Sequence, residues 1–114
     1  MKRLISAVLY VLIIFTCVSC GSSNVYSYSD RAVELGNAAL ETVNEFIDGS
    51  LTEEQAEKKL TNSVTLLDHC EGQDDVLLAS AVFNLQYAVS SKINGTGSMA
   101  TVKEKRDDLK DLLK

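Results

Sequence analysis

The chain has 114 residues, which is enough for one small domain with a single modest core. Its net charge is −5, with 16 acidic side chains against 11 basic ones. Nucleic-acid binding relies on basic patches that displace counterions from phosphates, so this balance argues against a nucleic-acid partner. It also argues against a domain that lies flat on an anionic membrane surface.

The first element along the chain is a short apolar segment at the N-terminus. Two basic residues at 2–3 precede an almost wholly apolar run over 4–18. The small residues Ser19 and Gly21 then flank Cys20. A basic start, a short apolar run and a small-residue cleavage site are typical of a secretory signal peptide.

The residues at the expected cleavage site resemble the lipobox of bacterial lipoprotein precursors. The box is Cys17-Val18-Ser19-Cys20, in which Cys17 stands where the family usually has an aliphatic residue. The resemblance implies that residues 1–19 are a lipoprotein signal peptide and that Cys20 becomes the acylated N-terminus, carrying palmitate-type chains. Two such chains anchor a protein stably without a spanning helix. We therefore expect a domain held on the extracytoplasmic face of the cell membrane, or facing the periplasm.

Two other interpretations of this segment stay open. An ordinary signal peptide cut nearby would leave a secreted protein. An uncleaved membrane helix would use the charge-free stretch over 4–29, whose apolar part is shorter than the roughly 20 residues of a span. All three place the domain after residue 28 outside the cytoplasm. Without lipidation, a Cys20–Cys70 disulfide also becomes available; with it, Cys70 has no partner in the mature chain.

Residues 20–29 are small and polar and predict a flexible tether, and residues 30–114 form the helical domain. Apolar residues recur at three- and four-residue spacing over 30–48, which predicts an amphipathic helix. Ser29 or Asp30 is the expected N-cap, and Gly49 the expected stop. The acidic residues of this helix are expected to form a solvated face: Glu34, Glu41, Glu45 and Asp48.

Two further helices are predicted over 53–70 and 74–93. Thr52 and Gln55 form a capping box before the first of them. The second is apolar on more than one side, which is typical of a central helix with neighbours around it. We expect the aromatic residues Phe46, Phe83 and Tyr87 to pack in the core.

A fourth helix is predicted over 99–113, after the glycine-rich break at 94–98. Thr101 and Glu104 suggest a second capping box. The chain has no proline and no convincing segment of strand period. The predicted fold is an all-α, four-helix, up-and-down bundle. The alternative is a three-helix bundle with a loosely attached C-terminal helix, because the apolar stripe of the last helix is thin.

No arrangement of residues in the sequence predicts catalysis or metal binding. His69 and Cys70 are adjacent, so on a helix their side chains would point about 100° apart. Glu71, Asp74 and Asp75 lack the alternating spacing of a calcium loop. We expect no catalytic residue, no metal and no cofactor, and predict that the protein is not an enzyme.

The predicted function is that of a lipid-anchored protein-interaction module at the bacterial envelope. Small lipoproteins of this build include exclusion and immunity lipoproteins, which block an incoming injection or transfer machine. Two alternatives are a small-ligand carrier, with a cavity next to Phe83 and Tyr87, and an envelope spacer that self-associates through its last helix.

Overall fold

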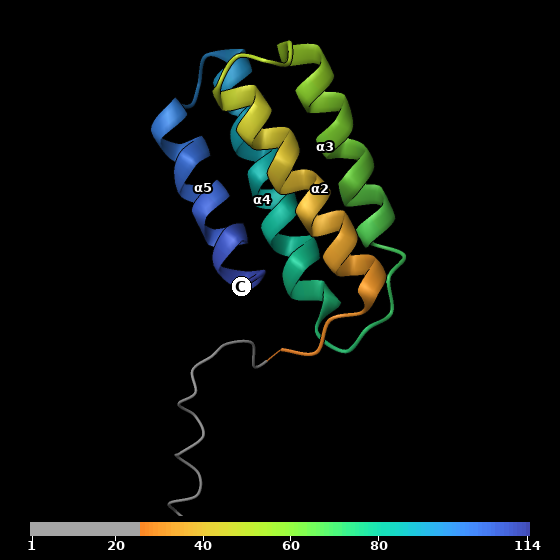
Figure 1. Ribbon diagram of the computed structural model, residues 1–114. Helices are drawn as coiled ribbons and strands as arrows, with labels where there is room; N and C mark the ends of the chain where they lie inside the picture. The colour runs from red at the N-terminus through yellow and green to blue at the C-terminus, as the bar shows by residue number, and fades with distance from the viewer. Residues whose placement is uncertain (1–25) are drawn as a thin grey trace, which may run out of the picture.

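The structure is a computed structural model, and it describes residues 26–114 (Figure 1). The predictions for the signal peptide over 1–19, for Cys20 and for most of the tether lie outside the described residues. Within residues 26–114 the chain is all-α, and its helices are α2 (Asp30–Ile47), α3 (Glu53–Leu67), α4 (Asp75–Asn94) and α5 (Met99–Leu112). These bounds agree with the predicted ones to within one or two residues, except at the end of α3.

The four helices form an up-and-down bundle in which each helix runs antiparallel to the next (Figure 1). Helix α4 lies between α3 and α5 and also contacts α2, which is diagonally across the bundle, whereas α3 and α5 do not touch. The core is built from aliphatic side chains and alanines of all four helices, with one phenylalanine, Phe46. The predicted four-helix bundle is therefore confirmed.

Helix α5 is an integral part of the bundle. Val102 and Leu109 are completely buried in the common core. The Arg106 guanidinium donates a hydrogen bond to the Asn44 side chain of α2, with a nitrogen–oxygen distance of 2.8 Å. Gly36 of α2 leaves room for the side chain of Leu113, which lies just beyond α5. The alternative of a loosely attached last helix is therefore wrong, because two fully buried residues suffice to dock its thin stripe.

Most helix ends follow from local sequence. The Ser29 hydroxyl accepts a hydrogen bond from the Ala32 amide and caps α2. Thr52 and Gln55 form the predicted reciprocal capping box. Gly49 adopts a φ of +88°, a left-handed conformation that glycine reaches without the strain of a Cβ atom.

One predicted helix end and one predicted cap are wrong. Helix α3 stops at Leu67, and the Cys70 amide closes a turn back onto the Leu67 carbonyl, so α3 does not extend to 70. The N-cap of α5 is Ser98, whose hydroxyl accepts a hydrogen bond from the Thr101 amide. Thr101 is thus the third residue of the helix and not its cap.

The end of the expected flexible tether is fixed to the bundle. The Ser27 amide donates to the Asp74 carboxylate at 2.7 Å, and the Asp74 amide donates to the Ser27 carbonyl. The Ser29 amide and hydroxyl both donate to the Asp75 carboxylate. The chain therefore enters the bundle beside the first turn of α4, at a defined point.

Candidate interaction surface

Helix α4 carries an exposed stripe of apolar and aromatic residues, which we call the α4 ridge: Val76, Ser80, Phe83 and Tyr87. The exposed fractions of Val76, Phe83 and Tyr87 are 66%, 52% and 66%, and Ser80 is also exposed. Successive spacings of four, three and four residues put the stripe on one side of the helix. The opposite side of α4 supplies the core with Leu78, Val82, Leu85 and Val89.

The prediction that Phe83 and Tyr87 pack in the core is wrong, whereas Phe46 is buried as expected. Helix α4 has two apolar stripes, and the bundle covers only one of them. The stripe that the bundle covers is aliphatic, with Leu78, Val82, Leu85 and Val89 completely buried, whereas the stripe that carries the two aromatic rings is left exposed. The polar Ser80 and Asn84 beside the aromatic stripe were the available signal that this side faces outward.

A shallow groove borders each side of the ridge. The groove toward α3 has a volume of about 390 Å³, and its walls include Val64 and Asp68. The groove toward α5 has a volume of about 520 Å³, with Thr101 and Lys105 on its far side. Both are depressions of the surface beside the aromatic rings and not the enclosed cavity that a small-ligand carrier requires at this place.

The ridge lies in an uncharged part of an acidic chain. Between Val76 and Ser91, α4 contains no Asp, Glu, Lys or Arg. The charges that border the ridge are Glu57 and Asp68 of α3 and Lys105 of α5. Glu57 accepts a hydrogen bond from the Ser90 hydroxyl at 2.6 Å, and Asp68 lines the groove beside Val76. By length and composition alone α4 could cross a membrane, a test that a central helix of a bundle also passes. The charge-free surface is therefore well suited to contact another apolar surface.

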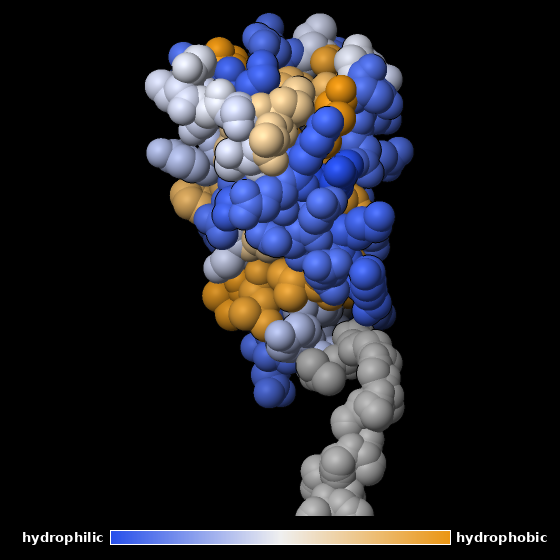
Figure 2. All heavy atoms as spheres, turned by 90° about the vertical axis from the view of Figure 1, so that its left-hand side faces the viewer, coloured by the Kyte–Doolittle hydropathy of each residue, from blue (hydrophilic) through white to orange (hydrophobic). Residues whose placement is uncertain are grey.

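The surface over α5 has a different character. Figure 2 shows hydrophilic side chains across the middle of this face and an apolar area below them, toward the end of the bundle where α5 finishes. Leu112, the last residue of α5, and Leu113 just beyond it are half-buried and pack against the core. An apolar stripe that runs along the length of a helix is therefore a property of α4 and not of α5.

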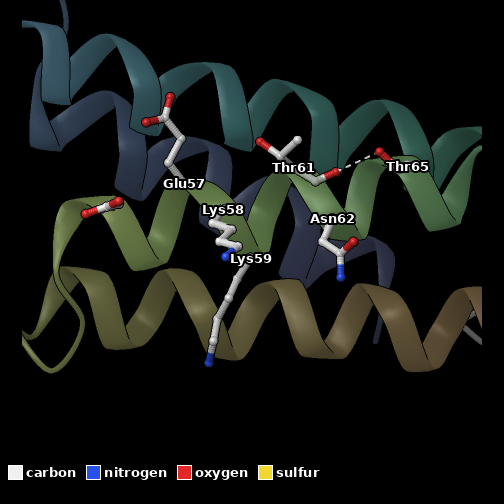
Figure 3. A pocket seen from close by; sticks show the side chains of 7 residues that line it. Glu57, Lys58, Lys59, Thr61, Asn62 and Thr65 are labelled. Atoms are coloured by element: carbon white, nitrogen blue, oxygen red, sulfur yellow. Dashed lines mark hydrogen bonds between the residues drawn. The ribbon is translucent and has the colours of Figure 1, made fainter.

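A wide depression on the surface of α3 does not form a binding site. It has a volume of about 810 Å³ and runs along α3 (Figure 3). Its lining residues all come from that one helix: Glu54, Glu57, Lys58, Lys59, Thr61, Asn62 and Thr65. Glu57 and Lys59 point to opposite sides of α3 in this view, so the side chains do not converge on a common ligand.

The residues examined for chemistry in the sequence do not converge either. The His69 Nδ1 atom lies 2.9 Å from the Thr65 carbonyl oxygen, and the Cys70 thiol points to the Leu66 carbonyl at 3.7 Å. The two side chains therefore have separate partners. Over residues 26–114, no group of three or more metal-ligating side chains comes together.

Asp74 and Asp75 instead hold the incoming chain. Asp75 is almost fully buried and accepts hydrogen bonds from Ser29 and from the Gly72 amide. Burial alone would raise the pKa of Asp75, but the Ser29 hydroxyl, the Ser29 amide and the Gly72 amide all donate to its ionised form and lower the pKa below the ordinary value. This aspartate has a structural role at the base of α4.

The chain was compared with family models, curated proteins and solved structures, and no match was found in any of the three.

Proposed function

We propose that this chain is a lipid-anchored, extracytoplasmic helical protein that acts as a protein-interaction module at the bacterial cell envelope, and that it docks through the α4 ridge. The observation that carries the proposal is the exposure of Val76, Phe83 and Tyr87 on one uncharged helix face. Exposed apolar stripes of this kind are unfavourable in water unless a partner covers them.

The anchor is Cys20. Its acyl chains join the membrane to a short segment that ends at Ser27, where the bundle begins. After cleavage, nine basic and sixteen acidic side chains remain, because Lys2 and Arg3 leave with the signal peptide; the mature net charge is −7. A membrane-bound domain of this charge stays soluble above the bilayer, and its uncharged ridge remains available for docking.

The subclass that we propose is an exclusion or immunity lipoprotein. The size of the chain, its all-α fold and its expected location support this assignment. Such a protein acts by binding and needs no catalytic residue, metal or cofactor. Expression in a sensitive bacterium should then reduce phage DNA entry or conjugation, whereas unchanged adsorption, entry and transfer would exclude this subclass.

The anchoring is tested by intact mass and membrane fractionation of the chain expressed in a bacterium, beside the Cys20→Ala variant. We expect a chain that begins at Cys20, carries a lipid-sized mass increment and fractionates with membranes, and a variant that loses the increment and the membrane association. An unmodified chain, or one that still begins at Met1, would overturn the anchoring.

Docking is tested separately with a photoreactive residue at position 87, beside a matched variant at Ala38. Ala38 is exposed on α2, on the opposite side of the bundle. Crosslinks to protein from position 87 and not from position 38 would support the ridge as the docking surface. Equal labelling from both positions would show that the ridge is not the docking surface.

A further inference from the structure

We propose that the partner of the α4 ridge is a second copy of this chain, which pairs in parallel, with α4 against α4, on the same membrane. The inference rests on the proposed lipid anchor. Four observations support it: the spacing of the ridge, its lack of charge, the point where the chain enters the bundle, and the opposite charges of Glu57 and Lys105 at its borders.

The spacing of the ridge matches a coiled-coil seam. Val76, Ser80, Phe83 and Tyr87 follow one another at intervals of four, three and four residues, as the a and d positions of a heptad do. A parallel pair brings each ridge residue against its own equivalent, so the two small Ser80 side chains meet at one level and let the helices approach closely there. A two-fold interface of this kind uses the same surface on both copies.

The entry point of the chain determines the direction of pairing. Ser27 and Ser29 are bonded to Asp74 and Asp75, so the anchored segment leaves the bundle beside Val76. Two copies anchored in one membrane therefore both have their Val76 ends nearest the bilayer. The two-fold axis then stands normal to the membrane and the two α4 helices run parallel, with each ridge residue near its own equivalent.

The charges at the borders of the ridge fit this arrangement. Helices α3 and α5 flank α4 on opposite sides, so a two-fold axis along the ridge places α3 of one copy opposite α5 of the other. Glu57 lies at the level of Ser90, and Lys105 lies near Tyr87 and Ala88, about one turn away. Glu57 of one copy and Lys105 of the other then lie on the same side of the seam, which itself carries no charge, and Asp68 lies at the Val76 end of the ridge.

The area of the ridge explains why the membrane is needed. A fully buried aromatic side chain removes about 150–250 Å² from water. Val76, Phe83 and Tyr87 are only partly exposed, so together they can bury much less than the roughly 800 Å² per partner of a standard interface. Anchored copies gain a high effective concentration and a common orientation. Pairing is thus expected on membranes, with largely monomeric protein in dilute solution.

The test uses single-cysteine variants of the full chain, expressed in a bacterium and processed there, in a Cys70→Ser background. Under mild oxidation of isolated membranes, Ser80→Cys should give a disulfide-linked dimer in roughly tenfold higher yield than the control Ala38→Cys on α2. Equal yields would mean random collision, and the proposal would fall. Absence of dimer from Ser80→Cys would also overturn the proposal. The α4 ridge would then be covered by a different protein or by the bilayer.

The register is tested with Val76→Cys and Tyr87→Cys. Parallel pairing links each variant to itself and gives few mixed links when the two are co-expressed. Predominant links between positions 76 and 87 would show antiparallel pairing and overturn the proposal. Glu57→Lys should lower the yield of dimer from Ser80→Cys, and the added change Lys105→Glu should restore that yield. An unchanged yield in both variants would show that Glu57 and Lys105 do not interact across the interface.

Failure of anchoring is distinguishable from failure of pairing. Fractionation and intact mass on the same samples report the anchor. A chain that begins at Gly21 keeps all four helices and their core, and an N-terminal polyhistidine tag attaches it to vesicles that contain a nickel-chelating lipid. Crosslinking of Ser80→Cys on these vesicles, beside Ala38→Cys, decides the pairing whatever the state of Cys20.

Discussion

Asp75 binds Ser29 through two hydrogen bonds, although the two residues are 46 positions apart in the chain. One carboxylate oxygen lies 2.8 Å from the Ser29 amide nitrogen and the other 2.6 Å from the Ser29 hydroxyl. The second oxygen also accepts from the Gly72 amide at 2.7 Å. Since the Ser29 hydroxyl in turn caps α2, a single carboxylate connects the starts of α2 and α4 with the loop between α3 and α4.

Replacing this carboxylate should destabilise the bundle. We expect Asp75→Ala to lower the free energy of unfolding by about 2–4 kcal/mol, because the amides of Ser29 and Gly72 lose their acceptor at a buried position. Urea denaturation measures the loss. The matched control is Asp74→Ala, which removes one hydrogen bond to Ser27 at an exposed position and should cost less than about 1 kcal/mol. Equal losses in the two variants would contradict this role of Asp75.

The same contact predicts a dependence of stability on pH. The pKa of Asp75 is lower in the folded chain than the ordinary value of about 3.9, so on acidification the unfolded chain takes up its proton first. The stabilising contribution is complete above that value and is lost as the pH falls through the folded pKa. The Ser50 hydroxyl and amide also lower the pKa of Asp48, which acts in the same direction.

The measurement is a series of urea unfolding curves between about pH 5 and about pH 2. The free energy of unfolding should fall with pH, and it should fall less steeply in Asp75→Asn, which has no carboxyl to titrate at this position. A variant that keeps the full slope would assign the acid sensitivity to other carboxylates.

The start of α5 offers a test of a cap that sequence reasoning placed incorrectly. Ser98→Ala should lower the free energy of unfolding by about 1 kcal/mol, because the Thr101 amide loses the hydroxyl that accepts its hydrogen bond. Thr101→Ala keeps that amide and changes an exposed residue, so its effect should stay within about 0.5 kcal/mol. Chemical denaturation of both variants decides between the two caps, and the reverse order of effects would restore Thr101 as the cap.

Local signals predicted most of this fold. The three- and four-residue periodicity gave four helices, and the pair Thr52 and Gln55 marked the start of α3 correctly, because capping involves neighbours in sequence. The cap at Ser98 was missed because Thr101 and Glu104 offered the same local pattern three residues later. Such a pattern identifies a helix start but leaves its position uncertain by about one turn.

Longer-range features were outside the reach of sequence reasoning. Nothing local indicates that Ser29 pairs with Asp75, since that contact exists only after α2 and α4 have packed. The candidate surface was missed for a related reason. Both stripes of α4 are apolar, and periodicity cannot say which one faces the core, because that choice is made by the packing of the neighbouring helices.

The two stripes of α4 should differ sharply in their contribution to stability. Leu85 is completely buried, so Leu85→Ala should lower the free energy of unfolding by about 2–5 kcal/mol through lost contacts and a cavity. Phe83 lies two residues away and is about half exposed, so Phe83→Ala should cost less than about 1 kcal/mol despite the larger side chain. Both variants are denatured as unlipidated protein at low concentration. The ridge is then uncovered, so the measured change reports the stability of the fold and not association between copies. A loss at Phe83 as large as that at Leu85 would place the aromatic stripe in the core and remove the surface on which docking depends.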